Sequence, residues 1–585
     1  MIRSLFFSLW LPLTVSATEI MDVHEIREGM KGIGKTVFEG TEVDSFEVEI
    51  LGVMRNVRPH GDIILARLSG GPSHREGRES LIEHTGIIAG MSGSPIYIEG
   101  KLIGALAFAW PFSKEPIAGI TPISEMQKIV MGEGGEGRRM LDDLKFKVKW
   151  NEEWEMVPIQ TPLLLSGFEE GVFRDVKVFF ESYGLLPTLG GLEGEDLHHS
   201  SLEPGSVIGV QLISGDARAG ALGTVTDREG DRILAFGHPF LWSGEVNFPM
   251  TTGYIHSILP SQFLSFKMGS TGEVVGKLIQ DRRAGVLGKM GEFSRMIPIE
   301  ISLQKFNDSG REKSSIQKYH FEVIQEKSLT SNLSGFLVLH SLFASGYSEG
   351  EMAIETDLTL EMKTPSGEFT LQQSDLYSGK DSPTTFVKEV TNLISSLHNN
   401  PYEPIEFDEI QFTLDLYEEE ERRGTLEALY VDKTSVKPGE DLQISLFYKP
   451  NRGERIRKNH SIKIPRDLPK GRVEVRVLDG KTLEKRELER DPFKKSHHDF
   501  TQFLDILRKE RRRNEIWIQL VLPRKGYIIQ GRELRALPPS LLSILSPSKE
   551  AGEGEVLNEE VIREERIPTE YDLSGFQSQS IEIIY

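Results

Sequence analysis

Short stretches with alternating or mostly apolar residues run through the N-terminal part of the chain, at residues 46–50, 63–66, 96–98 and 102–106. Glycines separate these stretches at short intervals, and a two-residue repeat is typical of β-strands with one buried face. No long amphipathic helix lies between them. The pattern therefore predicts a β-barrel or β-sandwich in this region.

A second block with the same texture covers about residues 196–300, with apolar runs at 207–212, 222–225 and 233–236. Between the two blocks, residues 132–139 are rich in glycine, glutamate and arginine and contain nothing to bury, which is typical of an exposed linker. The second block is predicted to be the other half of one β-rich domain.

The C-terminal half mixes helical and β patterns. Apolar residues recur at helical spacing in 386–397 and 500–507, which predicts two amphipathic helices packed on a core. Clean alternation at 442–446 and 473–477, after a Pro-Gly turn at 438–439, predicts an immunoglobulin-like β-sandwich.

These patterns give the following expected organisation. Residues 1–17 form a signal peptide, 18–131 the first half of the β-rich domain, and 132–195 a linker and connecting segment. Residues 196–300 form the second half, 301–410 an α+β segment, and 411–585 a β-sandwich-like module with a helix.

The composition narrows the class of protein. A chain of 585 residues needs several cores, and its formal net charge of −21 argues against nucleic-acid binding, which requires basic patches. The N-terminus has Arg3, an apolar run to Val15 and a small-residue site before Thr18, which predicts a signal peptide and a periplasmic or extracellular location. No second membrane span is expected after its cleavage. There is no cysteine, which excludes disulfides and zinc-thiolate sites, and no metal or other cofactor is implied.

The most informative segment is Gly-Met-Ser-Gly-Ser-Pro at residues 90–95. Small residues on both sides of Ser92 allow a sharp bend that exposes its hydroxyl. Such a bend can also aim the amides of Gly90 and Ser92 at one point, as an oxyanion hole requires. The spacing is similar to the nucleophile turn of chymotrypsin-like enzymes. A plain glycine-serine turn is the structural alternative.

A serine nucleophile needs a base, and the chain has 14 histidines. His238 lies where an apolar strand ends in a glycine and a proline follows, a strand-to-loop junction that suits a catalytic base. His60, His74, His84 and His256 lie in less distinctive settings. A histidine that merely forms a hydrogen bond at a strand end is the alternative reading of His238.

Together the two segments resemble the stage IV sporulation peptidase B (SpoIVB) family of serine peptidases. The family's serine segment is similar to residues 85–96, Thr-Gly-Ile-Ile-Ala-Gly-Met-Ser-Gly-Ser-Pro-Ile, and its histidine also follows an apolar strand and a glycine. A Gly-x-x-Gly-Glu-x-x-Gly segment matches residues 269–276, and a further turn matches 285–288. The resemblance covers roughly residues 28–130 and 196–292. It implies a chymotrypsin-like double β-barrel with Ser92 as nucleophile and His238 as general base.

The chain departs from this family in two ways. The family's histidine half precedes its serine half, whereas here Ser92 comes first, so the order is permuted; triads are defined by geometry and not by chain order. The family's acid precedes its serine by some fifteen residues, and no aspartate occupies that stretch here. Glu79 is the candidate for the third member, followed by Asp62 and Glu76, and a Ser-His dyad is also possible.

The resemblance implies a regulatory or self-cleaving endopeptidase that cuts a protein or peptide substrate. The C-terminal module would then serve recognition, for example of an envelope protein. The alternative is a catalytically inactive binding or scaffolding protein of the cell envelope that keeps the peptidase fold. An esterase with the same serine would share the chemistry but would need an acyl pocket.

Overall fold

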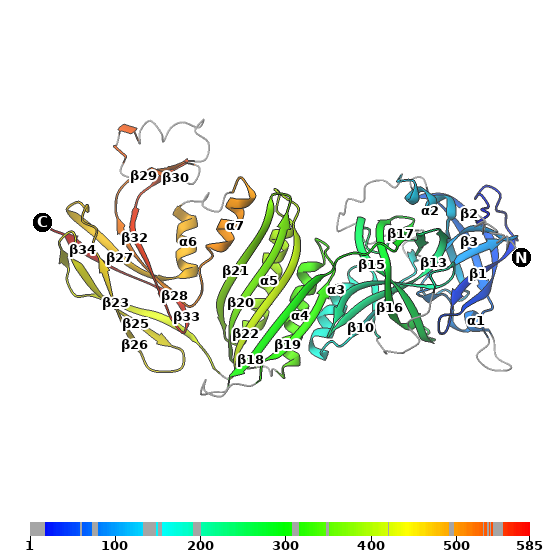
Figure 1. Cartoon of the computed structure of the whole chain (residues 1–585), viewed down its shortest axis with the longest axis horizontal. Coiled ribbons are helices and arrows are strands. Elements are labelled where there is room, and N and C mark those ends of the chain that lie inside the picture. Colours follow the sequence, from blue (N-terminus) through cyan, green and yellow to red (C-terminus); the bar gives the residue numbers. More distant parts are fainter. Residues whose placement is uncertain are drawn as a thin grey trace, which may run out of the picture. The chain divides into compact units, whose positions relative to one another are not determined.

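The structure is a computed structural model that describes residues 18–58, 61–72, 80–132, 148–149, 155–190, 201–306, 315–346, 350–418, 420–490, 497–529, 532–534, 537–538, 540–541 and 554–585 (Figure 1). The chain divides into two compact units, Met1–Met296 with Glu322–Glu326, and Ile297–Phe321 with Lys327–Tyr585. The predicted signal peptide lies outside the described residues. None of the described helices has the length and apolar character to cross a membrane.

Six strands of the first unit, all from the serine-bearing half of the sequence, close into a barrel. Phe46, Val48 and Ile50 point into its core while Glu47 and Glu49 between them face outward, as the alternation predicted. The closure is complete because β5 pairs with both β1 and β6. The ring order is β1 (Lys31–Val37), β2 (Val43–Arg58), β3 (Gly61–Ser69), β7 (Ile117–Pro122), β6 (Lys101–Ala109) and β5 (Pro95–Ile98).

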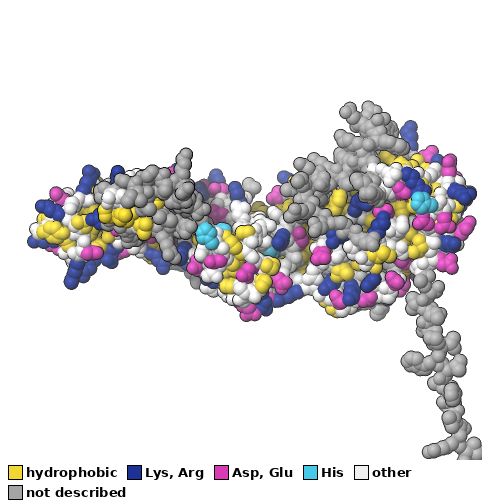
Figure 2. Space-filling model, turned by 90° about the horizontal axis from the view of Figure 1, so that it is seen from above, with side chains coloured by type: hydrophobic (Ala, Val, Ile, Leu, Met, Phe, Trp, Pro, Cys, Tyr) yellow, Lys and Arg dark blue, Asp and Glu magenta, His cyan; other side chains and the backbone are white. Residues whose placement is uncertain are grey.

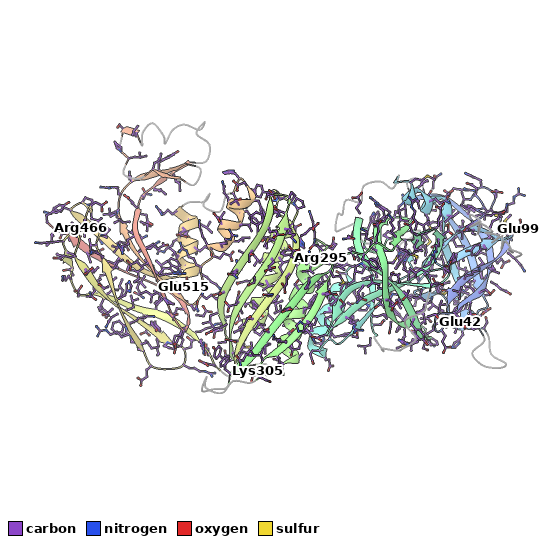
Figure 3. The ribbon with its side chains drawn as sticks, in the orientation of Figure 1. Glu42, Glu99, Arg295, Lys305, Arg466 and Glu515 are labelled. Atoms are coloured by element: carbon purple, nitrogen blue, oxygen red, sulfur yellow. The ribbon has the colours of Figure 1, made fainter. Side chains whose placement is uncertain are left out.

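A tight turn joins β5 to β6. Glu99, labelled in Figure 3, has φ 52° and Gly100 has φ 81°. Two successive left-handed residues are typical of the two-residue hairpin turns that match the twist of paired strands.

A second closed ring of six strands carries the histidine-bearing half. The ring closes because β12 pairs with both β13 and β15. Its order is β12 (Val207–Gly215), β13 (Arg218–Glu229), β14 (Arg232–Ala235), β17 (Gly285–Met290), β16 (Ser265–Arg282) and β15 (Gly244–Leu259). The prediction of a mainly β fold with a barrel core is confirmed.

Residues 155–190, expected only to connect the halves, contribute structure to both barrels. Strand β9 (Glu155–Pro158) pairs with β6 of the first barrel, and β10 (Thr161–Ser166) pairs with β13 of the second. Helix α3 (Glu170–Glu181) then leads into β11 (Leu185–Leu189), which lies parallel to β10. Smaller elements of this unit are α1 (Leu81–Thr85), β4 (Ile88–Ala89), α2 (Ile123–Val130) and β8 (Val148–Lys149).

The second unit begins with a sheet and two helices. Helix α5 (Ser382–His398) buries Phe386, Val390 and Ile394, so the predicted amphipathic helix is confirmed. Helix α4 (Thr330–Ala344) is buried along most of its length. The strands are β18 (Ile297–Phe306), β19 (Gln317–Val323), β20 (Met352–Thr364), β21 (Gly367–Ser378) and β22 (Glu406–Glu418). Lys305 of β18, labelled in Figure 3, pairs with Glu418 of β22 at 2.8 Å.

The C-terminal module has two sheets that share one hydrophobic core, to which Leu442 and Ile444 of one sheet and Val473, Val475 and Ile518 of the other contribute. Its immunoglobulin-like strand order stays a prediction. The first sheet contains β23 (Arg423–Val431), β25 (Asp441–Pro450), β26 (Ile456–Lys463) and β33 (Asp572–Ser574). The second contains β24 (Ser435–Val436), β27 (Gly471–Asp479), β28 (Glu515–Leu522), β32 (Glu560–Pro568) and β34 (Phe576–Ile583).

The remaining elements of this module are two helices and a small sheet. Helix α7 (Phe500–Arg508) buries Phe500, Phe503, Leu504 and Leu507, which confirms the second predicted helix. Helix α6 (Gly480–Arg490) precedes it, and the small sheet contains β29 (Gly526–Ile529), β30 (Arg532–Leu534) and β31 (Gly554–Leu557). Lys and Arg side chains are interspersed with Asp and Glu over the face in Figure 2.

Candidate active site

The predicted nucleophile lies in a tight turn between β4 and β5. Gly90 and Gly93 both have φ 94°, a left-handed conformation that favours glycine over any residue with a Cβ atom. The Ser94 amide and the Ser94 hydroxyl both donate to the carbonyl of Met91, at 3.0 and 2.7 Å. Ser94, the second serine of the motif, therefore stabilises the turn. The hydroxyl of Ser92 has no such role in the turn.

Strand β13 of the second barrel holds this turn by three hydrogen bonds. The Thr224 amide donates to the Ser92 carbonyl at 2.9 Å, and the Thr224 hydroxyl donates to the Gly90 carbonyl at 3.1 Å. The Thr226 hydroxyl donates to the Gly93 carbonyl at 2.8 Å. The serine turn thus belongs to the first half in sequence but is anchored on the second barrel.

The segment that leads to His238 packs against the same turn. A Cβ atom on Gly93 would come within 2.5 Å of the Phe236 nitrogen, so no side chain fits between them. A Cβ atom on Gly237 would lie 2.9 Å from that of Ala105 in β6, and the Gly237 carbonyl accepts a hydrogen bond from the Thr121 hydroxyl at 2.6 Å. The structure therefore brings together the two segments that the sequence singled out.

The hydroxyl of Ser92 is buried, with none of the residue's surface exposed. Within the described part of the chain its Oγ has no hydrogen-bond partner. Buried polar atoms are nearly always bonded, so an unsatisfied hydroxyl in a protein core calls for an explanation. In particular, no hydrogen bond joins Ser92 Oγ to His238, so the structure places the predicted nucleophile and base on packed segments but does not bond them.

His238 is 3% exposed, and its orientation defines the position of its proton. Its Nδ1 lies 2.8 Å from the carbonyl oxygen of Pro239. A carbonyl can only accept, so Nδ1 carries the hydrogen and Nε2 of the neutral ring is the nitrogen that accepts a proton. This is the tautomer that a general base for a serine hydroxyl requires.

A buried acid that the sequence analysis missed holds the loop after His238. The carboxylate of Asp281, at the end of β16, accepts hydrogen bonds from the amides of Phe240 at 2.8 Å, Leu241 at 2.7 Å and Ser243 at 3.1 Å. Asp281 has no exposed surface. These three partners are backbone N–H groups, which leave no trace in the sequence.

The predicted third members of a triad have different outcomes. Glu79 and Glu76 lie outside the described residues. Asp62 accepts from Arg55 at 2.7 Å and from the Asn56 amide at 2.9 Å. Burial alone would raise the pKa of Asp62, but these bonds hold it below its usual value. The Asp62 carboxylate is therefore engaged in a local ion pair.

One of the two predicted oxyanion donors is engaged in this conformation. The Gly90 amide donates to the carbonyl of Gln160 at 3.2 Å, in the segment that joins β9 to β10. For Gly90 and Ser92 to act together as an oxyanion hole, the Gln160 carbonyl must first release this amide. The Gly90 amide is therefore not available to an oxyanion in this structure.

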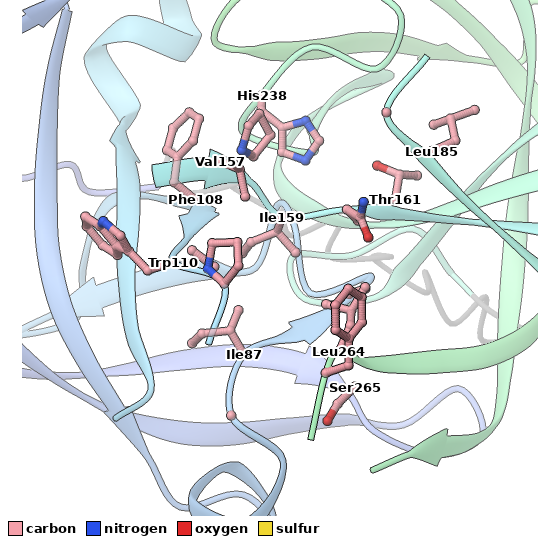
Figure 4. Close-up of a pocket in the computed structure, with 18 of the residues that line it drawn as sticks. Ile87, Phe108, Trp110, Val157, Ile159, Thr161, Leu185, His238, Leu264 and Ser265 are labelled. Carbon is pink, nitrogen blue, oxygen red and sulfur yellow. The ribbon is translucent and has the colours of Figure 1, made fainter. Parts of the chain in front are cut away.

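His238 lies on a pocket of about 530 Å³ (Figure 4). Its lining is largely apolar and aromatic, and includes Phe108, Trp110 and Leu264. Phe112 and Phe263 also line it; they are 70% and 73% exposed, with their ring centroids 5.4 Å apart in an edge-to-face arrangement. Ser92 is not among the described residues that line this space.

Strained backbone is concentrated around this pocket. Five non-glycine residues of the described chain have positive φ, and three of them are aromatic: Phe112 at 61°, Phe236 at 68° and Trp242 at 54°. Phe112 and Trp242 line the pocket, and Phe236 is two residues before His238. Backbone strain of this kind clusters at functional sites, where the surrounding structure imposes it.

A buried lysine lies beside the serine turn. Lys267 is 1% exposed, and its Nζ donates to the Thr36 hydroxyl at 2.7 Å. A Cβ atom on Gly90 would come within 3.2 Å of the Lys267 Cδ. Burial lowers the pKa of Lys267 to about 7. In the sequence, apolar Phe266 and Met268 flank Lys267, so alternation alone would have placed this lysine on the outward face.

We expect Lys267→Met to stabilise the first unit, and more so at pH 6 than at pH 10. Between the folded pKa of about 7 and the ordinary value of 10.5, only the unfolded chain holds the proton, so wild-type stability rises with pH. Below about pH 7 the folded chain must bury the charge. The gain should be on the order of a few kcal/mol at pH 6, measured by urea unfolding at both pH values. An equal gain at both would contradict a buried titrating amine.

A second serine–histidine pair lies on adjacent strands of the second barrel. His256 Nε2 is 2.8 Å from the hydroxyl of Ser270, and burial lowers the pKa of His256. The pair lacks the glycine turn that surrounds Ser92, and it provides a matched control for experiments on Ser92. Within the described ranges, no three His, Asp or Glu side chains gather as metal ligands.

Comparison with known proteins supports the interpretation of the serine segment. Residues 11–124 match the family model described as SpoIVB peptidase S55. The match includes the serine turn and does not extend to His238. Neither the curated proteins nor the solved structures contain a significant match to the chain.

Proposed function

We propose, from the premise that residues 11–124 carry the signature of the SpoIVB peptidase S55 family, that the chain is an exported serine endopeptidase with a regulatory or self-cleaving role. The observation that carries this proposal is the packing of Gly93 against Phe236. It joins the matched serine turn to the strand end that bears the candidate base.

In the proposed reaction, His238 Nε2 takes the proton of the Ser92 hydroxyl while Ser92 Oγ attacks a peptide carbonyl. The imidazolium then gives this proton to the leaving amine, and water hydrolyses the acyl-enzyme with His238 again as base. The Pro239 carbonyl, bonded to Nδ1, stabilises the positive charge that develops on the ring. The amides of Gly90 and Ser92 stabilise the oxyanion once Gln160 releases Gly90.

The pocket beside His238 suggests the kind of substrate. Its volume of about 530 Å³ exceeds that of a single side chain, and its lining is rich in aromatic residues. We expect it to bind an extended stretch of protein that carries a large apolar side chain. The substrate can be another protein or a segment of this chain.

The remaining parts of the proposal concern location and partners. The N-terminal pattern of residues 1–17 supports export to the periplasm or beyond, with cleavage before Thr18. The C-terminal two-sheet module has its own core, which suits a docking domain for an envelope protein. The mechanism uses side chains and backbone only, so no cofactor is proposed.

Two observations favour a second candidate function, that of an inactive binding module with a peptidase fold. Ser92 is fully buried, and the Gly90 amide is engaged by Gln160. Both would be permanent in a binding module, whereas both would be reversible in a latent enzyme. The two functions therefore differ in whether Ser92 ever becomes reactive.

The test is labelling of the mature full-length chain with a fluorophosphonate, which reacts with activated serines. We expect the wild type to be labelled and Ser92→Ala to lose the label. Ser94→Ala and Ser270→Ala should both keep it, because Ser94 is bonded to Met91 and Ser270 belongs to the other serine–histidine pair. A folded wild type that stays unlabelled, also with an apolar peptide added to open the site, would favour the binding module.

A further inference from the structure

One peptide group lies between His238 and the buried acid Asp281. The carbonyl of Pro239 accepts from His238 Nδ1 at 2.8 Å. The N–H of Phe240, on the other side of the same peptide bond, donates to Asp281 Oδ1 at 2.8 Å. Because a trans peptide is planar and directs its C=O and N–H to opposite sides, it can link the ring and the carboxylate in one chain of hydrogen bonds.

This chain of hydrogen bonds has an electrostatic consequence. A carboxylate that accepts the N–H polarises the peptide and makes its carbonyl a stronger acceptor, since linked hydrogen bonds strengthen one another. The stronger carbonyl holds the proton on Nδ1, orients the ring and favours its positively charged form. These are the roles that the acid of a Ser-His-Asp triad performs by direct contact.

We propose that Asp281 is the positioning acid of this site and acts on His238 through the Pro239–Phe240 peptide. The inference rests on the proposed function, in which His238 is the base. Asp281 takes the role of the third, acidic member of the site, for which the sequence suggested Glu79. Asp281 is distant from Ser92 in the chain and follows the histidine, so the spacing of known triads does not point to it.

The local structure fits a carboxylate held for this purpose. The amides of Leu241 and Ser243 donate to Asp281 Oδ2, and the amide of Phe240 donates to Oδ1. Trp242, with φ 54°, bends the loop so that these amides converge on one side chain. Burying a carboxylate completely is costly, and a neutral loop could be closed without one. A role in the reaction accounts for a charged group at this place.

Other charged or titratable groups face the same site and must stay constant in any test. Glu115, Glu181, Tyr183 and Arg283 line the pocket together with His238. Arg283 also lies 3.5 Å from Glu125. The variants below change none of them, so a change in the titration of His238 can be assigned to Asp281 or to the linking peptide.

The first experiment compares the wild type with Asp281→Asn. We expect the rate of fluorophosphonate labelling to fall by about 10- to 100-fold, the size of effect known for residues that orient a metal-binding histidine through a hydrogen bond. In a plot of labelling rate against pH, the acid limb of the variant should shift to lower pH by about one unit. The reason is that the neutral side chain in Asp281→Asn no longer favours the charged form of the His238 ring. Asp281→Glu should restore part of the rate.

The second experiment changes the linking peptide itself, and an ester there also makes the Pro239 carbonyl a weaker acceptor for His238 Nδ1. An ester in place of the Phe240 N–H breaks the bond to Oδ1 and leaves Asp281 in place, whereas an ester at Ser243 breaks a bond to Oδ2 and serves as the matched control. We expect the Phe240 ester to move the acid limb as Asp281→Asn does and the Ser243 ester to leave it unchanged. Equal shifts from both esters, or none from either, would overturn the proposal.

A spectroscopic readout separates this inference from the proposed function. With ¹⁵N-labelled histidine, the signal lost in His238→Gln identifies His238, and its shifts report the tautomer and the titration midpoint. We expect the Nδ1-protonated tautomer in the wild type, and a lower midpoint with mixed tautomers in Asp281→Asn and in the Phe240 ester. A protein that shows these changes but does not react with the fluorophosphonate would contradict the proposed peptidase function and support the link between Asp281 and His238. A protein that reacts with the fluorophosphonate but lacks these changes would support the peptidase function and contradict the link.

Discussion

His238→Ala is expected to slow fluorophosphonate labelling of Ser92 by roughly 10²–10⁴-fold, the usual contribution of a positioned general base. The nearly buried ring presents Nε2 as its proton acceptor because Nδ1 donates to the Pro239 carbonyl. Without the ring, the Ser92 hydroxyl keeps its proton and reacts as an ordinary alcohol. The measurement is the second-order rate constant from labelling at several probe concentrations.

The matched control is His256→Ala, which removes the histidine bonded to Ser270. It should label at the wild-type rate, because that pair is not part of the serine turn. Near-UV circular dichroism should be unchanged in both variants. A His238→Ala protein that is folded and labels as fast as the wild type would assign the base to another residue, and Lys267 beside Gly90 would be the next candidate.

Gly93→Ala is expected to destabilise the first unit by more than about 3 kcal/mol and to abolish labelling. The new methyl group would lie 2.0 Å from the Thr224 carbonyl oxygen and 2.5 Å from the Phe236 nitrogen, both of them backbone atoms. The φ of 94° adds the conformational cost of a side chain in the left-handed region. The loss should appear as a lower urea midpoint for the transition of this unit.

Gly100→Ala separates the effect of the steric clash from the cost of a side chain at positive φ. Gly100 has φ 81° in the turn between β5 and β6, and a Cβ atom there would meet nothing within 4 Å. It should therefore cost only about 1 kcal/mol and leave labelling intact. If Gly93→Ala were no worse than Gly100→Ala, the close packing of the serine turn on the second barrel would be wrong.

Local patterns predicted the features that depend on neighbours in the chain. Alternation at residues 46–50 placed the right side chains in a barrel core, and helical spacing located α5 and α7. The glycines around Ser92 indicated a sharp turn, which their positive φ values confirm. The apolar run before Gly237 located the strand end at His238.

Other features depended on backbone groups that residue identity does not encode. Residues 155–190 looked like a connection because short strands at barrel edges carry a weak pattern, yet β9 and β10 add to both barrels. The sequence predicted that the Gly90 amide serves an oxyanion hole, but in the structure this amide donates to the Gln160 carbonyl at 3.2 Å. No pattern in the sequence records which carbonyl will lie opposite which amide.

The sequence by itself determined a mainly β chain with a serine turn and a histidine at a strand end, because these follow from side-chain periodicity and glycine conformation. Only the tertiary structure decided that Gly93 packs on Phe236, that Asp281 accepts from three backbone amides in the loop after His238, and that Ser92 is buried and does not line the pocket. The Gly93–Phe236 contact joins the two halves of the barrel domain, and the Asp281 contacts join positions about 40 residues apart within the second barrel. Their formation depends on how the barrels close and pack.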